Sequence, residues 1–308
     1  MSKKNTVSLF IIIIILTLVS FLGCKAYSAY NEAKTKRLAL KRKKAAWDSL
    51  SRSLEKTVLS FKGQVGIVVK DLDTNWEIAF NKDTALPSAS LVKIPIMLSC
   101  YYAAQEGKIS LTDTISLRGS EKVPGSKVLG DAPAGSVFSI QDLLGPMITE
   151  SDNTAANVLI DTMGFDALNS YFKKIGLKNT NLSRKMLDFK ERGEGVENYT
   201  TAREMAYLLE ALYHKRFLNK AVSEKCLRLL GQQKVNDRIP RGLPQGTLVA
   251  HKTGLENYIC HDVGIVFTGK GDFLICVLVR HSDRFAKPTK RFISRLSSLA
   301  YNYYQNLN

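Results

Sequence analysis

The spacing of apolar residues changes several times along the chain and divides it into helical and extended stretches. From Trp47 to Phe61 apolar residues recur at steps of three and four, which predicts one face of an amphipathic helix. Residues 64–70 and 76–80 are rich in β-forming side chains and are separated by the polar stretch 71–75. This arrangement predicts two strands joined by a turn.

The middle of the chain, about residues 90–235, has a mainly helical pattern. Ser139 with Asp142 is typical of a helix N-cap. Thr201 with Glu204 fits a capping box, in which each side chain bonds to the backbone of the other residue. We therefore expect helices to begin after both positions.

Extended stretches return after Gly246 and end before a last helical pattern. The expected strands and the final helix cover residues 248–253, 261–268, 273–279 and 292–304. Because strands occur at both ends of the body and helices fill the middle, we predict an α+β fold. Its antiparallel sheet is built from about residues 45–89 and 236–308, and residues 90–235 form a helical insert. The groove between sheet and insert is the expected site.

The first 24 residues carry a membrane-targeting pattern. Lys3 and Lys4 precede an uncharged apolar run from Val7 to Cys24, which as a helix spans about 27 Å, close to the hydrocarbon thickness of a bilayer. We expect an extracytoplasmic protein that is anchored to the membrane or secreted. Residues 22–24 resemble a lipoprotein cleavage box with Cys24 as the lipidated residue, and an uncleaved signal anchor is the alternative.

The formal net charge of +16 is unevenly distributed. Residues 1–60 hold 12 Lys and Arg against 3 Asp and Glu, and residues 25–44, after the apolar run, contain a basic juxtamembrane segment. A nucleic-acid-binding protein would more often carry a basic face with interleaved aromatics on its folded body, so we expect no nucleic-acid partner. The basic segment is either a solvated helix face or a surface attracted to anionic headgroups or wall polymers.

The five cysteines have no metal-ligand spacing, so we expect no metal site. Cys24 lies in the terminal segment, and the others lie among apolar neighbours, as structural cysteines do. A disulfide between Cys260 and Cys276 is left open by the sequence.

Ser90 and Lys93 lie three positions apart at the start of a helical run, which places both side chains on one helix face. A Ser hydroxyl needs a base to act as a nucleophile, and a Lys can serve only if its pKa is lowered. This motif is weak alone, because Ser53 and Lys56 have the same spacing in a helix whose function is packing.

Two further short motifs follow. Ser151, Asp152 and Asn153 precede a helical run, where such residues are also ordinary N-caps. Lys252, Thr253 and Gly254 lie in an apolar strand, where an edge lysine and a bulge are also ordinary. Each structural explanation is credible alone, but order, spacing and context together indicate one catalytic arrangement.

The three motifs resemble those of class A β-lactamases and the related penicillin-binding D,D-peptidases, a motif set already known for that family. The resemblance covers about residues 45–308. It implies a five-stranded antiparallel sheet flanked by terminal helices, with an inserted all-helical domain. It also implies a monomer that needs no cofactor.

The resemblance implies a role for each matching residue in acylation. Ser90 would be the nucleophile and Lys93 its proton acceptor, while Ser151 would pass the proton to the leaving nitrogen. Lys252 would hold the substrate carboxylate and favour a neutral Lys93.

The resemblance also implies the residues that bind substrate. Asn153 would bond to the acyl side-chain amide, and Thr253 beside Gly254 would bind the carboxylate. The backbone N–H of Leu255, with that of Ser90, would form the oxyanion hole.

The chain departs from the family in the loop between the second and third motifs. Class A β-lactamases carry there a Glu that activates the deacylating water, whereas this chain has Met186 or Leu187 at about that position. Asp188 and Glu194 are the carboxylates nearby, and we expect that neither fully replaces the missing Glu.

The leading prediction is a β-lactamase-like serine hydrolase that acts on β-lactams or D-Ala-D-Ala-like amides through an acyl-serine intermediate. A D,D-peptidase of peptidoglycan metabolism, acting on stem peptides with slow deacylation, is the first alternative. A non-catalytic wall-binding protein on the same fold is the second, although such a protein has no need to keep Ser90, Lys93, Ser151 and Lys252.

Overall fold

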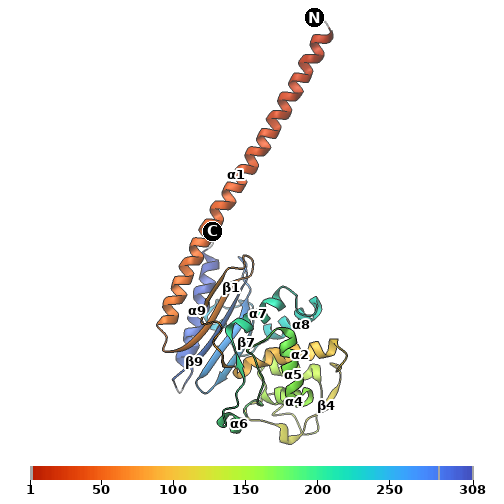
Figure 1. Cartoon of the computed structure of the whole chain (residues 1–308), viewed down its shortest axis with the longest axis vertical. Helices are drawn as coiled ribbons and strands as arrows, with labels where there is room; N and C mark the ends of the chain where they lie inside the picture. The colour runs from red at the N-terminus through yellow and green to blue at the C-terminus, as the bar shows by residue number, and fades with distance from the viewer. Residues whose placement is uncertain (1–2, 284, 307–308) are drawn as a thin grey trace. The chain divides into compact units, whose positions relative to one another are not determined.

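The computed structural model describes residues 3–283 and 285–306, and side chains from residue 16 onward within these ranges. The chain forms two compact units, residues 1–52 and 53–308. Helix α1 (Lys3–Leu59) makes up the first unit and enters the second (Figure 1). Among the residues searched, no helix is long and apolar enough to cross a membrane. Residues 7–15, the first half of the apolar run, lie outside the described side chains.

Residues 53–308 contain, in the described part, a five-stranded antiparallel sheet in the order β2-β1-β9-β8-β7. Its strands are β1 (Gly63–Asp71), β2 (Glu77–Phe80), β7 (Val249–Glu256), β8 (Ile259–Val266) and β9 (Phe273–His281). The five expected strands are thus confirmed, within a few residues at their ends. The α+β fold class is also confirmed.

The helical part lies between β2 and β7 in sequence and beside the sheet in space (Figure 1). Its main helices are α2 (Lys93–Gln105), α3 (Ile140–Thr149), α4 (Asn153–Met163), α5 (Phe165–Ile175), α7 (Ala202–Tyr213) and α8 (Lys220–Gly231). It also contains the paired short strands β3 (Leu86–Pro87) with β6 (Tyr199–Thr200), and β4 (Thr114–Ser116) with β5 (Val137–Ser139). The sequence pattern missed these because two or three residues show no periodicity.

Alternation along the strands divides the core between the two faces of the sheet. Val68, Val263 and Cys276 are register partners and belong to the core that includes the helical part. On the other face, Phe273 stacks on Tyr304 of α9 (Lys287–Gln305). Since side chains alternate between faces with a period of two, the sheet is covered on both sides.

Of the two predicted helix caps, the one at Ser139 is confirmed and the one at Thr201 is confirmed only in part. Ser139 and Asp142 form the full capping box at the start of α3. Thr201 accepts a hydrogen bond from the Glu204 backbone, as expected, but Glu204 does not return it. Its carboxylate instead accepts hydrogen bonds from the backbones of Lys178 and Asn179, so the capping box was wrong in its second half.

The described cysteines are all free thiols. Cys260 lies opposite Val279 and Cys276 lies opposite Val263 in neighbouring strands, so no disulfide joins the two cysteines. Cys24 is exposed on α1.

Candidate active site

Ser90 lies in a short 3-10 turn, η1 (Ala89–Val92), between β3 and α2. The preceding residue, Ala89, has a φ of 44°, a left-handed conformation that non-glycine residues seldom adopt. The segment is held at both sides: the Ser88 backbone N–H bonds to the Asn198 carbonyl at 2.7 Å, and His261 Nε2 lies 2.8 Å from the Pro87 carbonyl. The strained turn that carries Ser90 is therefore fixed by the surrounding structure.

Lys93 is fully buried in the first turn of α2 and joins the first motif to the second. Its Nζ donates to the Ser151 carbonyl at 2.7 Å, to Ser151 Oγ at 3.3 Å and to Asn153 Oδ1 at 2.6 Å. All three acceptors are neutral oxygens. Burial lowers the pKa of Lys93 to about 7, although Asp152 and Glu256 act in the opposite direction. A substantial neutral fraction of Lys93 can thus accept a proton near neutral pH.

Ser151 lies between α3 and α4 with a φ of 59°. The following residue, Asp152, caps α4 by accepting from the Ala155 backbone at 2.9 Å, and it also accepts from the backbones of Val128 and Leu129. Asp152 is therefore structural. The left-handed turn directs both oxygens of Ser151 toward Lys93.

Lys252 is fully buried on β7 and also bonds to Ser151. Its Nζ donates to Ser151 Oγ at 2.9 Å and to the Thr253 carbonyl at 2.9 Å. Its pKa is well below the ordinary value, first because of burial and then because Lys93 and Arg238 carry like charge. A hydroxyl accepts two hydrogen bonds and donates one. Two lysines that donate to Ser151 Oγ leave its proton available for a third partner.

Gly254 is required by the close approach of β7 to the Ser90 segment. A Cβ at this position would lie 3.2 Å from His261 Cδ2 and 3.3 Å from both Leu91 Cγ and the Ser88 carbonyl. Such distances are tighter than nine in ten real Cβ contacts. The glycine therefore lets the third motif lie against the turn that carries the nucleophile.

The histidines that flank the third motif are embedded in hydrogen bonds. His261 Nδ1 accepts from the Val279 backbone at 2.9 Å, so its Nε2 carries the proton that goes to the Pro87 carbonyl. Burial lowers the pKa of His261 to about 4, which keeps it neutral. His251 Nδ1 lies 2.9 Å from Asp262 on the neighbouring strand. Both histidines connect parts of the scaffold.

Arg238 was missed by sequence reasoning. This guanidinium is 1% exposed, donates to Cys260 Sγ at 3.2 Å and lies close enough to Lys252 to lower its pKa. With Lys93 and Lys252 it gives the site three buried basic side chains, and the positive potential of the guanidinium suits an anionic substrate. A single Arg in a loop has no spacing signature, so no signal in the sequence identified it.

The loop between the second and third motifs places Met186 at a fixed point. Its backbone N–H donates to Asn157 Oδ1 at 2.7 Å, and Asn157 Nδ2 donates to its carbonyl at 3.1 Å. Met186 is buried, and Leu187 follows with a φ of 61°.

The two candidate water activators flank α6 (Phe189–Gly193), beyond Met186 in the loop: Asp188 is its N-cap and Glu194 its C-cap. Asp188 caps this helix by accepting from the Glu191 backbone at 3.1 Å, and Glu194 is exposed at its end. No hydrogen bond in the described part of the chain links either carboxylate to Lys93 or Ser151. The structure thus brings the three motifs together but not these two residues, whose role stays a prediction.

Buried ion pairs close this loop and attach it to β7, and sequence reasoning missed them as well. Arg184 is 1% exposed and pairs with Glu197 at 2.7 Å and with Glu256 at 3.0 Å. Arg192 lies 3.2 Å from Glu197 and 3.3 Å from Glu256. The loop is therefore held at both ends and against the strand of the third motif.

The described residues contain no cluster of three or more His, Cys, Asp or Glu that could hold a metal ion. The site consists of hydroxyls, an amide and basic side chains. Apart from Arg238, these groups are supplied by α2, α4, β7 and the turns before the two helices. Such groups suit nucleophilic attack on an acyl compound that carries a negative charge.

Fold and site together define the class A β-lactamase and penicillin-recognising type of structure. A family model described as the β-lactamase enzyme family matches residues 49–304. The chain belongs to this family.

Individual relatives agree with this assignment. The β-lactamase VEB-1 of Pseudomonas aeruginosa is 24% identical over 85% of this chain and 92% of its own length. A crystal structure of a β-lactamase from Sphaerobacter thermophilus is 30% identical over 84% of this chain and 98% of that chain, with a TM-score of 0.75. The structure of PBP-A is 25% identical over 83% of this chain and 96% of that chain, with a TM-score of 0.76. The same comparison finds a mutant of PBP-A as an acyl-enzyme complex with penicillin G.

Proposed function

We propose that this chain is a serine enzyme that is acylated on Ser90 by β-lactams and by D-Ala-D-Ala-like amides. The observation that carries the proposal is the position of Lys93, whose buried Nζ has a pKa of about 7 and bonds to Ser151 Oγ, which also bonds to Lys252. These contacts link Lys93, Ser151 and Lys252, one residue from each motif, through hydrogen bonds.

In the proposed acylation, Ser90 Oγ attacks the substrate carbonyl carbon while its proton passes to neutral Lys93. A C–O bond forms, and the negative charge on the carbonyl oxygen is held by the backbone N–H groups of Ser90 and Leu255. The C–N bond then breaks, Ser151 gives its proton to the leaving nitrogen, and Lys93 returns a proton to Ser151. The substrate carboxylate pairs with Lys252 and Thr253, with Arg238 adding positive potential.

The rate at which the acyl group is released from Ser90 distinguishes a β-lactamase from a D,D-peptidase. A β-lactamase hydrolyses the ester quickly, and the family supports that activity for this chain. A D,D-peptidase or penicillin-binding enzyme is favoured by the loop between the second and third motifs. We expect Met186 or Leu187 at about the position of the water-activating Glu of class A β-lactamases, and Met186 is buried with its backbone fixed by Asn157. We infer that the ester on Ser90 is long-lived with β-lactams.

The test uses the purified full chain in mild detergent, with Ser90→Ala as control. A fluorescent penicillin reports the covalent label, and a chromogenic cephalosporin reports turnover. A single burst with a stable Ser90-dependent label supports slow release, whereas continuous turnover supports a fast β-lactamase. Absence of any Ser90-dependent label would refute both enzymatic functions, and a non-catalytic wall-binding protein would be the remaining hypothesis.

We also propose that residues 1–24 attach the enzyme to the outer side of the membrane. The apolar side chains from Leu16 to Leu22 are more than half exposed, and such a patch in water is unfavourable unless lipid covers it. Membrane fractionation after deletion of residues 2–24 tests the anchor, since undiminished membrane association would refute it. Lipid labelling of wild type against Cys24→Ser separates a lipoprotein from a signal anchor.

A further inference from the structure

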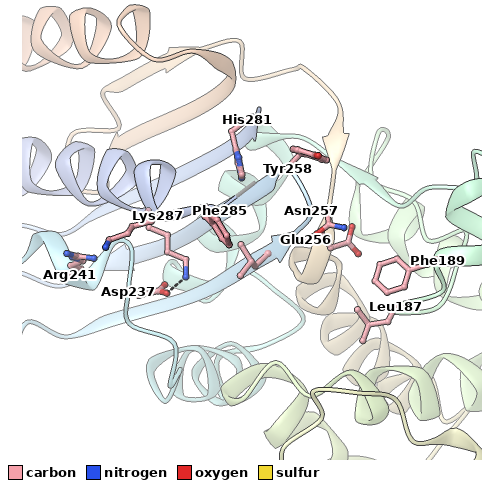
Figure 2. Close-up of a pocket in the computed structure, with 13 residues that line it drawn as sticks. Leu187, Phe189, Asp237, Arg241, Glu256, Asn257, Tyr258, His281, Phe285 and Lys287 are labelled. Carbon is pink, nitrogen blue, oxygen red and sulfur yellow. Dashed lines mark hydrogen bonds and ion pairs between the residues drawn. The ribbon is translucent and has the colours of Figure 1, made fainter. Parts of the chain in front are cut away.

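Two regions outside the three motifs carry several basic side chains. One is a cavity of about 700 Å³ at the end of β7, where Figure 2 shows basic and acidic side chains together and Lys290 pairs with Asp237 at 2.6 Å. This cavity reaches the third motif at Leu255 and belongs to the candidate active site. The other region is the part of α1 that follows the apolar run, which the proposed acylation does not use (Figure 1).

Residues 34–44 of α1 form a dense array of positive charge. They contain seven Lys and Arg and no Asp or Glu. At a helical rise of about 1.5 Å per residue they extend over about 15 Å, which gives one charge in about 2 Å. Duplex DNA carries one negative charge per about 1.7 Å of its axis. The segment therefore has nearly the charge density of duplex DNA, with the opposite sign.

Four of these charges lie on one face of α1, and we call them the basic stripe. The stripe residues follow one another at steps of three, four and three, and all are exposed: Lys34, Arg37, Lys41 and Lys44. Like charges at such steps repel one another. Within the described part of the chain, only Lys44 among them has an acidic partner, Asp48 at 2.8 Å. A partner that carries several negative charges relieves this repulsion.

The stripe lies too far along α1 for lipid headgroups to be its partner. In the proposed attachment, whether by an anchor helix or by a lipid on Cys24, residue 24 lies at the edge of the hydrocarbon. The headgroup layer beyond it is about 7 Å thick, and physiological salt screens charge over about 8 Å more. Lys34 is about 15 Å along the helix from residue 24, and Lys44 is about 30 Å from it. The stripe therefore begins where the field of the headgroups ends.

The form of α1 also keeps the stripe away from a bilayer. Residues 25–46 contain no Gly or Pro, which are the usual causes of a kink, and α1 is continuous through them. A helix that lies on a bilayer needs a continuous apolar face. Leu38 and Leu40 lie two positions apart, on opposite sides of the helix, and both are exposed. Tyr27 and Tyr30, just after the apolar run, are the side chains suited to the headgroup layer.

We propose that the basic stripe binds a linear polymer of the cell envelope that carries a phosphate in each repeat unit. Lys and Arg are the side chains that bind phosphate, and neighbouring charges on one polymer contact several stripe residues at once. This contact holds the exported enzyme in the polymer layer. The inference goes beyond the proposed acylation and uses the proposed membrane attachment only to exclude lipid.

The binding is measured with the full chain in non-ionic detergent and end-labelled linear polyphosphate, by fluorescence anisotropy. The test variant replaces all four stripe residues with Gln, which forms helix nearly as well as Lys and Arg: Lys34→Gln/Arg37→Gln/Lys41→Gln/Lys44→Gln. The matched control removes four exposed charges from residues 53–308: Lys173→Gln/Lys178→Gln/Lys220→Gln/Lys225→Gln. Circular dichroism checks that both variants keep the helix content of the wild type.

We expect the control to bind as the wild type does, and the stripe variant to bind at least about tenfold more weakly at about 0.1 M salt. For single-stranded polyanions, each phosphate contact changes the slope of log K against log salt by about −0.7. Four contacts therefore predict a slope that is steeper by about 3 in the wild type than in the stripe variant. Inorganic phosphate at the same phosphate concentration should not displace the polymer, because it has no neighbouring charges.

A second measurement separates the polymer from lipid. The wild type and the stripe variant are partitioned into vesicles of phosphatidylcholine with and without phosphatidylglycerol. The preference for the anionic vesicles should be the same in both proteins. A preference that the stripe variant loses would mean that headgroups are the partner, and would overturn the proposal.

The polymer measurement has three results that would each overturn the stripe as a polymer site. These are polyphosphate binding that the stripe variant keeps, binding that falls equally in the control, and binding that inorganic phosphate displaces. None of them depends on Ser90 or on the anchor, because the chain is held in detergent. Labelling of Ser90 and membrane fractionation test those two proposals separately, so their failure is distinguishable from failure of the stripe.

Discussion

The buried Lys93 predicts how the acylation rate depends on pH. With a pKa of about 7, Lys93 is neutral in about a tenth of molecules at pH 6, half at pH 7 and nine-tenths at pH 8. Because only the neutral amine can accept the Ser90 proton, the rate constant should rise about fivefold from pH 6 to pH 7 and about twofold from pH 7 to pH 8. The direction follows from burial, which lowers the pKa of a lysine.

Lys93→Arg removes this base and keeps the positive charge. Arg does not lose its proton in proteins, so acylation should fall by the usual contribution of a general base, about 10²- to 10⁴-fold. Lys56→Arg is the matched control, because Lys56 has the same spacing from Ser53. Stopped-flow measurement with a fluorescent penicillin gives both results. A rate that is flat between pH 6 and 8, or a Lys93→Arg variant near wild type, would refute the role of Lys93.

Two further variants, each with a control, test residues that hold the active site in place. Gly254→Ala places a Cβ against the Ser90 segment and should slow acylation about tenfold to a hundredfold, as small misplacements of reacting groups do. The control is Gly269→Ala, whose added Cβ would have no atom within 4 Å and which should be acylated at the wild-type rate. Equal acylation rates in the two variants would show that residue 254 need not be glycine. Arg184→Gln removes the buried cation between Glu197 and Glu256, which then keep only the more exposed Arg192 as an ion-pair partner. This variant should cost about 3 kcal/mol, or roughly 10 °C in Tm by calorimetry. Arg203→Gln, which removes only an exposed pair with Asp83, should leave Tm unchanged, and a similar Tm for both variants would contradict this account.

The sheet and the helical insert could be predicted because their signals are local. Strands of eight or nine residues, such as β7 and β9, show their β-rich composition directly, and the capping box at Ser139 requires only residues that are close in sequence. The three motifs could be found for the same reason, since each consists of a few residues that lie close together in the sequence. Their meeting in space followed from the resemblance, not from the spacing.

The remaining features of the site depend on contacts between distant residues. Arg184 pairs with Glu256 across 72 positions, and nothing in either neighbourhood of the sequence indicates the partner. The low pKa of Lys93 arises from complete burial, which is a property of the packed core. The left-handed turn at Ser151 is set by Asp152 capping α4 next to it, although the sequence offered three residues equally suited to cap.

Met186→Glu tests whether this position limits release of the acyl group. Its backbone is fixed by two hydrogen bonds to Asn157, so a Glu would be introduced without freedom in the main chain. A general base at this point should accelerate loss of the Ser90 ester by about 10²- to 10⁴-fold and convert a stable label into turnover. Because Met186 is buried, a carboxylate there should also lower Tm, since burial disfavours its charged form.

Met186→Gln is the control, because it has nearly the same shape as Glu and no basic group. The rate of release is read from the decay of the fluorescent penicillin label, with mass spectrometry of the intact chain to confirm hydrolysis. Faster decay in the Glu variant alone means that acylation and release depend on separate groups, Lys93 for the first and residue 186 for the second. Equal decay in both variants would mean that disruption of the loop, and not a missing base, controls release.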